Sequence, residues 1–153
     1  MSITVRKILE KKGQELEFSL VAGEKGLDNI VETPEMNRPG LAIAGFYDVF
    51  SHDRIQIIGI TESSFLEKMN PDERKTRLSK MFQFKIPCFI VTSGRQVPEY
   101  FLNLADEHDV PVFTTPIPTS RFSGRLSYYL ELEFAPSCTL HGVLLDVYGM
   151  GVL

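Results

Sequence analysis

Cysteine is scarce in this chain, and its scarcity argues against two classes of protein. The 153 residues include only two cysteines, Cys88 and Cys138, which lie in separate strand-like segments and form no metal-type pair. A disulfide-rich scaffold or a cysteine-ligated zinc site needs more thiols at characteristic spacings. We expect both thiols to be reduced and buried, as in a cytosolic protein.

Long apolar runs and an excess of basic residues are also missing. No stretch is apolar over the length needed to cross a membrane, and Met1–Lys7 lacks the apolar core of a signal peptide. The formal net charge is −4, with lysine and arginine scattered along the chain, so there is no electrostatic footprint for nucleic acid. These absences predict a cytoplasmic protein with neither nucleic acid nor membrane as a partner.

A further absence concerns nucleotide binding. The phosphate-loop pattern G-x-x-x-x-G-K-[ST] occurs nowhere between Met1 and Leu153. What is present is the composition of a soluble globular domain, with 43% hydrophobic and 24% charged residues in a chain of ordinary domain length.

Alternating strand and helix patterns predict the fold class. Strands are expected at residues 17–21, 30–31, 55–60, 88–91 and 112–113, and helices at 5–12, 61–68, 71–82, 98–108 and 120–134. Strands separated by helices predict an α/β protein with three layers, in which a mixed, mostly parallel sheet carries helices on both faces. The early short strands would add antiparallel edges.

Residues with strong conformational preferences mark the expected helix ends. Thr4 is placed to cap the first helix, and Gly13 to end it in the left-handed conformation. Thr119 or Ser120 is placed to cap the last helix. Between these helices, the small and apolar residues 41–45 follow a Pro-Gly turn, and they predict close packing under another element.

The last stretch, residues 140–153, reads as a strand up to Val147, followed by a glycine-permitted reversal and a second apolar run. One interpretation is a terminal hairpin that completes the sheet of its own domain. The other is the first hairpin of a second domain, because natural domains cover or shorten free strand edges.

Two separate segments resemble blocks of one known family. The runs His141-Gly142-Val143-Leu144, Asp146-Val147-Tyr148-Gly149 and Gly151-Val152-Leu153 resemble the opening of the catalytic domain of HPr kinase/phosphorylases. Residues 37–47, ahead of the strand at 54–59, resemble a second block of that family in the right order. The resemblance implies an N-terminal α/β domain over residues 1–136, similar to the first domain of some Mur ligases. It assigns residues 137–153 to the first hairpin of a truncated C-terminal P-loop kinase domain.

The resemblance also implies a reaction. Members of the family phosphorylate a serine of HPr, a protein of the bacterial phosphotransferase system, using ATP or pyrophosphate and Mg²⁺. They also reverse the reaction, with inorganic phosphate attacking the phosphoserine and pyrophosphate leaving. HPr is the implied partner, and the family's hexamers imply a homo-oligomer. Because the family's phosphate loop follows this run, we expect the fragment alone to bind no cofactor and to be inactive.

His141 is the one catalytic residue that the resemblance implies. In the family, the histidine of this motif lies near the transferred phosphate, where an imidazole can hydrogen-bond a phosphate oxygen or stabilise developing charge. Without the motif, a single histidine beside a glycine on a strand is usually structural. Asp146 is either an orienting group for that site or a solvated carboxylate on the strand.

The expected carboxyl ends of the strands suggest a second site. In open α/β sheets ligands collect at this edge. The polar residues expected there are Thr61, Ser63, Thr92, Ser93, Arg95, Thr114, Thr115, Ser120 and Arg121. Of these, Thr92, Ser93, Arg95, Thr114 and Arg121 are candidates for holding a small anion such as a phosphorylated metabolite. The alternative is that they are ordinary caps and turn residues, and it is the better supported of the two.

Two functions therefore stand side by side. The first is the N-terminal assembly or regulatory domain of a bifunctional kinase/phosphorylase, and the second is a stand-alone module that senses a small anion. The codons that follow Leu153 discriminate between them, since a Gly-rich loop with Lys-Ser favours the first and a stop codon favours the second.

Overall fold

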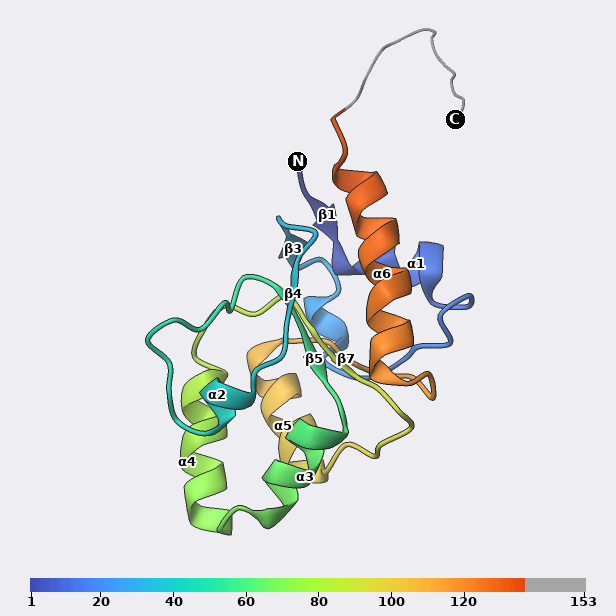
Figure 1. Ribbon diagram of the computed structural model, residues 1–153. Helices are drawn as coiled ribbons and strands as arrows, with labels where there is room; N and C mark the ends of the chain where they lie inside the picture. Colours follow the sequence, from blue (N-terminus) through green and yellow to red (C-terminus); the bar gives the residue numbers. More distant parts are fainter. Residues whose placement is uncertain (137–153) are drawn as a thin grey trace, which may run out of the picture.

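A five-stranded sheet with the order β2-β7-β6-β5-β4 organises the structure (Figure 1). Its parallel strands are β4 (Met36–Asn37), β5 (Ile55–Ile58), β6 (Phe89–Val91) and β7 (Val112–Thr114). β2 (Ser19–Ala22) joins β7 antiparallel at one edge, and β1 (Ile3–Thr4) pairs separately with β3 (Ile30–Val31). This computed structural model describes residues 1–136, so the hairpin predicted at 137–153 lies outside the described residues.

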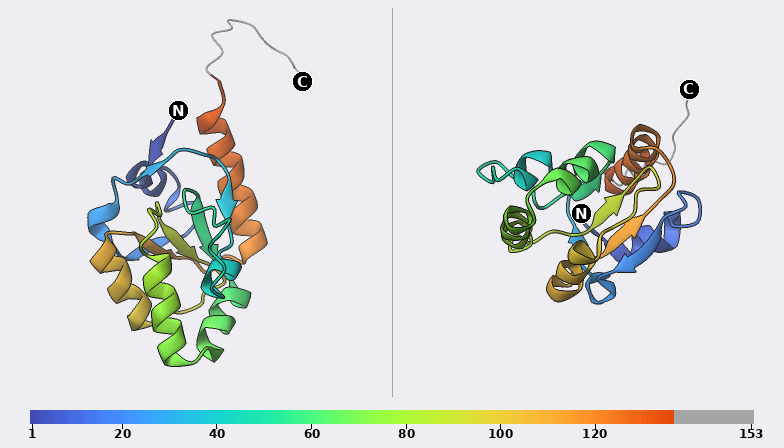
Figure 2. Two further views of the ribbon diagram at one scale, coloured as in Figure 1. Left: turned by 90° about the vertical axis from the view of Figure 1, so that its left-hand side faces the viewer. Right: turned by 90° about the horizontal axis from the view of Figure 1, so that it is seen from below.

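Helices cover both faces of the sheet (Figure 2). On one face lie α1 (Val5–Lys12) and α6 (Thr119–Phe134). On the other lie α2 (Gly40–Ile43), α3 (Ile60–Lys68), α4 (Pro71–Met81) and α5 (Glu99–His108). A short 3-10 turn, η1 (Glu24–Gly26), follows β2. The prediction of a three-layer α/β fold with a mixed, mostly parallel sheet is confirmed.

Alternation along the strands divides the core into two clusters. In β5, Ile57 packs with α1 and α6, whereas the next residue, Ile58, packs with the helices of the opposite face. The same switch occurs between Val112 and Phe113 in β7. Successive side chains of a strand point to opposite faces, so a strand covered on both sides is apolar at every position. This is why the central strands read as continuous apolar runs.

The first helix begins as predicted but ends differently. The Lys7 amide donates a hydrogen bond to the Thr4 hydroxyl at 3.1 Å, which confirms the N-cap. Gly13 follows the last helical residue, yet its φ of −57° is right-handed, so the predicted left-handed cap is wrong. The chain instead continues in helical turns, and the left-handed residue is Glu17, with φ of 52°. The reversal is closed by the Phe18 amide, which donates to the Gly13 carbonyl at 3.0 Å.

Three of the short elements were not predicted, whereas the two-residue strand predicted at 30–31 is present as β3. β1, β4 and α2 span only 2 to 4 residues each, and such lengths are too short for hydrophobic periodicity to be recognised. The predicted close packing of residues 41–45 is confirmed in part, because Ala42 and Ile43 of α2 are buried and α2 contacts α3 and α4. Leu41 in the same segment is exposed.

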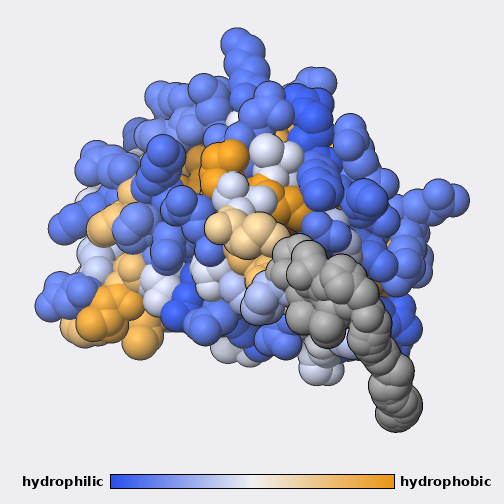
Figure 3. Space-filling view, turned by 90° about the horizontal axis from the view of Figure 1, so that it is seen from above, coloured by the Kyte–Doolittle hydropathy of each residue, from blue (hydrophilic) through white to orange (hydrophobic). Residues whose placement is uncertain are grey.

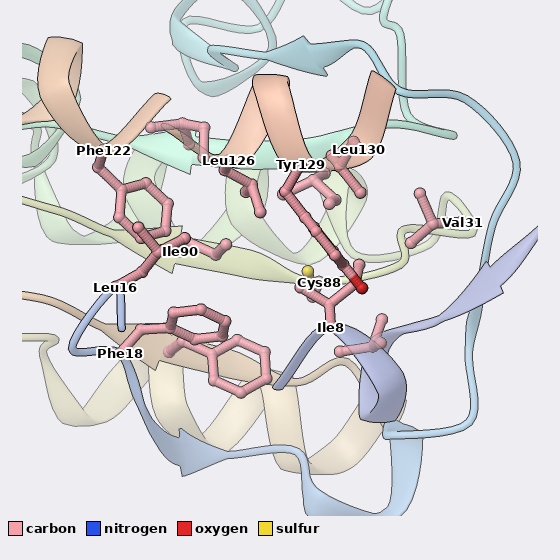
Figure 4. Close-up of a cluster of buried hydrophobic side chains, with 14 of the residues drawn as sticks. Ile8, Leu16, Phe18, Val31, Cys88, Ile90, Phe122, Leu126, Tyr129 and Leu130 are labelled. Carbon is pink, nitrogen blue, oxygen red and sulfur yellow. The ribbon is translucent and has the colours of Figure 1, made fainter. Parts of the chain in front are cut away.

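The cluster beneath α6 contains one polar group without a partner (Figure 4). The Tyr129 ring extends from α6 into the space between the sheet and α1. Its hydroxyl is the single buried side-chain polar atom, within residues 1–136, that has no hydrogen bond. Burial, followed by the nearby Glu133 carboxylate, raises the pKa of Tyr129, so the hydroxyl stays protonated at neutral pH.

We expect Tyr129→Phe to stabilise the protein by about 1 kcal/mol, because a buried hydroxyl without a partner opposes folding by its desolvation cost. Such a gain raises the melting temperature by roughly 2–4 °C in a protein of this size. Tyr128→Phe is the control, since Tyr128 is 70% exposed and should show no change. A lower melting temperature for Tyr129→Phe alone would show that the hydroxyl is hydrogen-bonded in solution, contrary to this expectation.

Cys88 is buried in the same cluster, in line with its predicted burial. Desolvation raises the pKa of its thiol, so the thiol stays protonated and unreactive at neutral pH. Cys138 lies outside the described residues.

Among the helices of residues 1–136, none has the combination of length and apolar character that a bilayer requires. At the end of the molecule where α6 finishes, most side chains are hydrophilic, with small apolar areas between them (Figure 3).

Candidate functional site

The carboxyl ends of β5, β6 and β7 meet at one edge of the sheet, which the right-hand view of Figure 2 shows from below. Small and polar residues follow each strand there: Gly59 after β5, Thr92–Arg95 after β6 and Thr115 after β7. Two features lie along this edge. One is a polar cluster between β5 and β6, and the other is an open groove beside β7.

The polar cluster is closed by its own hydrogen bonds. The buried Glu62 carboxylate accepts from the Gly59 amide and from the Arg38 guanidinium, each at 2.8 Å. Beside it, the hydroxyls of Thr92 and Thr119 lie 2.6 Å apart. A Cβ added at Gly59 would lie 2.6 Å from both the Arg38 Nη2 and the Thr119 hydroxyl, so the space is already filled. The cluster thus joins the ends of β5 and β6 to α3 and α6 through hydrogen bonds of the protein itself.

The cluster also explains why the predicted cap of the last helix is wrong. α6 begins at Thr119 itself, its N-cap position is Pro118, and no side chain caps the helix. The Thr119 hydroxyl bonds to Thr92 of the neighbouring strand end instead, and Ser120 is exposed in the first turn. The Thr119 hydroxyl therefore makes a tertiary hydrogen bond in place of the local bond to the helix backbone that a capping residue makes.

The groove beside β7 has a volume of about 470 Å³ and is open to solvent. β2 is antiparallel to β7, so the start of β2 lies at the same edge as the carboxyl ends of β6 and β7. The groove is lined by Glu17, Ser19, Val21, Gly94, Arg95, Gln96, Val97, Leu102, Thr114, Thr115 and Pro116. It therefore combines an apolar floor with hydroxyls, an amide and one charge of each sign.

The structure separates the candidate anion-binding residues. Arg95 and Thr114 line the groove together. The Thr92 hydroxyl is buried in the closed cluster, while Ser93 adopts a left-handed φ of 62° next to the groove. Arg121 is exposed on α6 and does not line the groove. The two arginines are thus not brought into one site.

Sequence reasoning missed three charged residues of this edge. Arg38 and Glu62 form their ion pair across 24 positions, and nothing in the local sequence of either residue indicates the other. Glu17 was assigned to a strand, and its place in the groove follows from the pairing of β2 with β7. The sequence did contain part of one signal for Glu62. It follows Gly59 by three residues, the spacing at which a glutamate accepts a hydrogen bond from the backbone amide of the N-cap residue.

His141 and Asp146 lie outside the described residues, so the structure gives no account of the predicted catalytic histidine or of its orienting carboxylate. Within residues 1–136, no group of three or more histidine, cysteine, aspartate or glutamate side chains is placed to hold a metal ion.

Comparison with known sequences identifies the family. Residues 3–130 match the profile described as HPr serine kinase N terminus, which covers most of the chain. The chain belongs to this family. Its similarity to HPr kinase/phosphorylase was predicted from residues 37–47 and 141–153, and the family match now confirms it over residues 3–130.

Curated relatives of the family extend well beyond this chain. The HPr kinase/phosphorylase of Brevibacillus brevis is 39% identical over 136 residues, which are 89% of this chain and 44% of the relative. That of Clostridium perfringens strain SM101 is 41% identical, covering 100% of this chain and 48% of the relative. The Listeria monocytogenes HCC23 protein is 38% identical, over 99% and 47% of the two chains. This chain thus spans about half the length of these relatives.

One solved structure supports the fold. It contains the CBS and DRTGG domains of the regulatory region of Clostridium perfringens pyrophosphatase, in complex with its activator diadenosine tetraphosphate. The TM-score is 0.54 with 17% identity, and the match covers 80% of this chain and 46% of the other. At this identity the likeness concerns the arrangement of helices and strands alone.

Proposed function

We propose that this chain is the N-terminal part of a bifunctional HPr serine kinase/phosphorylase of the bacterial phosphotransferase system. It would contribute assembly or regulation, while the portion of the relatives that this chain does not cover performs catalysis. The observation that carries the proposal is the family match over residues 3–130, together with relatives of that name near 40% identity. The stand-alone sensor considered from the sequence is not favoured by these relatives.

The cofactors of the proposed reaction would lie outside this chain. Phosphoryl transfer to a serine needs a backbone cradle for phosphate, a divalent cation and a carboxylate that accepts the serine proton. The chain contains no phosphate-loop pattern, and the buried carboxylate and hydroxyls of the polar cluster bond to groups of the protein itself. ATP or pyrophosphate, and Mg²⁺, would therefore bind in the full-length enzyme, with HPr as the protein substrate. We place this enzyme in the cytoplasm.

We also propose that the full-length enzyme is a homo-oligomer and that this domain takes part in its assembly. Large apolar side chains are exposed on adjacent elements, namely α2, the segment that follows it, and α3. They are 40% to 73% exposed and comprise Leu41, Phe46, Val49, Ile60 and Phe65. Neighbouring apolar side chains of this kind are typical of surfaces that other proteins cover.

A chimera tests the proposal. Residues 1–153 are joined to the portion of the Clostridium perfringens relative that follows its aligned segment, and phosphoserine in HPr is measured by mass spectrometry with ATP and Mg²⁺. We expect the chimera to phosphorylate HPr and to form a multimer in light scattering, and we expect the 153-residue chain alone to give no product. His141→Ala should reduce phosphorylation by the chimera about a hundredfold or more if its imidazole stabilises the transferred group. Turnover by the chain alone would overturn the proposal.

A further inference from the structure

The groove beside β7 has the position and size of a ligand site. Its volume of about 470 Å³ lies within the range of small-molecule pockets, roughly 300–1,000 Å³. It lies at the carboxyl ends of parallel strands, the edge at which open α/β sheets bind ligands. Unlike the neighbouring polar cluster, it is not filled by the protein's own hydrogen bonds.

The two charges of the groove come from opposite flanks. Glu17 precedes β2 on one side, and Arg95 follows β6 on the other, with Thr114 of β7 between them. The strands that they flank, β2 and β6, are separated by two strand spacings, or roughly 10 Å. A molecule lying across the end of β7 would therefore meet a carboxylate at one end and a guanidinium at the other.

Both charged groups can accept a new partner. Within residues 1–136, the Glu17 carboxylate makes no ion pair or side-chain hydrogen bond. The Arg95 Nε and Nη2 donate to Ser63 and Glu67, but both distances are 3.4 Å, beyond the usual range of a strong hydrogen bond. A carboxylate that bound Arg95 in bidentate geometry would form shorter, charge-assisted bonds.

The backbone around the groove is held in uncommon conformations. Glu17 and Ser93 adopt positive φ values of 52° and 62°, although neither is glycine, and Gly94 between Ser93 and Arg95 also has positive φ. Residues held in this region are enriched at ligand sites, where the surrounding structure fixes their direction. Here the backbone conformation at Glu17, and at Ser93 and Gly94 before Arg95, fixes the positions of the Glu17 and Arg95 Cα atoms.

The charge pattern selects the class of ligand. Among residues 1–136, Arg95 is the only cation that lines the groove. The carboxylate of Glu17 lines it too, and that of Glu67 lies 3.4 Å from the Arg95 guanidinium. A phosphate dianion would meet more negative than positive charge. A zwitterion satisfies both ends, and the apolar floor of Val21, Val97 and Leu102 fits aliphatic side chains. An extended dipeptide spans about 7 Å. This is less than the distance between the two flanking strands, and the side chains of Glu17 and Arg95 are long enough to reach its two ends.

We propose that this groove binds a short zwitterionic peptide with aliphatic side chains, whose carboxylate contacts Arg95 and whose ammonium group contacts Glu17. The peptide backbone would take its remaining hydrogen bonds from Ser19, Gln96 and Thr114. This inference goes beyond the proposed kinase/phosphorylase role and does not depend on it.

The test uses the ¹⁵N-labelled 153-residue chain and four probes: alanyl-leucine, N-acetyl-alanyl-leucine, alanyl-leucine amide and inorganic phosphate. We expect alanyl-leucine to shift the amide signals of Gly94 and Thr114. Glu17→Gln and Arg95→Gln should each weaken its binding about tenfold to a hundredfold, as expected for the loss of one charge-assisted contact. Glu131→Gln and Arg121→Gln, exposed on α6 away from the groove, are the matched controls and should leave binding unchanged.

The two blocked peptides, each of which lacks one terminal charge, show which end of the peptide contacts Glu17 and which contacts Arg95. Glu17→Gln should not weaken binding of the acetylated peptide further, and Arg95→Gln should not weaken binding of the amide further. The proposal is overturned if alanyl-leucine causes no shifts, if both blocked peptides bind as well as the free one, or if the control variants lose binding equally. Tighter binding of phosphate than of alanyl-leucine would also overturn it, in favour of an anion site.

Discussion

Gly23→Ala is expected to lower the free energy of unfolding by about 3 kcal/mol or more, through backbone strain and overpacking together. Gly23 has φ of +73°, and a Cβ at this position would lie 2.0 Å from the Val110 carbonyl oxygen. The obstruction is backbone and cannot rotate away. The clash can be removed only if the chain at Gly23 and the segment before β7 move apart. This movement would also strain the 2.7 Å hydrogen bond from the Gly23 amide to the Asp106 carboxylate.

Gly124→Ala is the matched control for this substitution. Gly124 lies in α6, and a Cβ there would meet nothing within 4 Å. Because alanine has the higher helix propensity, this variant should gain about 0.5–1 kcal/mol. Urea unfolding followed by circular dichroism measures both variants. A Gly23→Ala protein within about 0.5 kcal/mol of the unsubstituted chain would contradict the close approach seen here.

Leu126→Ala should lower the free energy of unfolding by about 3 kcal/mol, because it removes a large buried side chain and leaves a cavity. Leu126 is fully buried between α6 and the sheet, in the cluster that contains Phe122 and Ile57. Its loss affects α6, which covers this face of the sheet together with α1.

Leu132→Ala provides the same chemical change on the same helix, at a position that is 59% exposed. The two variants share any difference in helix propensity, so the gap between them isolates burial. We expect Leu132→Ala to stay within about 0.5 kcal/mol of the unsubstituted chain. Equal losses for the two leucines would mean that α6 does not pack on the sheet in solution as it does here.

The candidate site was only partly predictable. The carboxyl edge was correctly located, since β6 and β7 are continuous apolar runs followed by polar residues. The partners within the site were not predicted, because Arg38 pairs with Glu62, and Glu17 lines the same groove as Arg95, across long stretches of sequence. Thr119 illustrates the difficulty: its local pattern predicts a helix cap, and its hydroxyl bonds to Thr92 of another strand end.

The sequence by itself determined the kind and order of the long elements. Periodicity and turn chemistry act over a few residues, and they placed the central strands, the Thr4 cap and the apolar face of α6. The antiparallel edge formed by β2 was predicted, but tertiary structure alone decided that its partner is β7, that Gly13 does not reverse the chain, and which charges share a groove. These outcomes depend on contacts between residues far apart in the chain, whose energies are settled only when both faces of the sheet are packed.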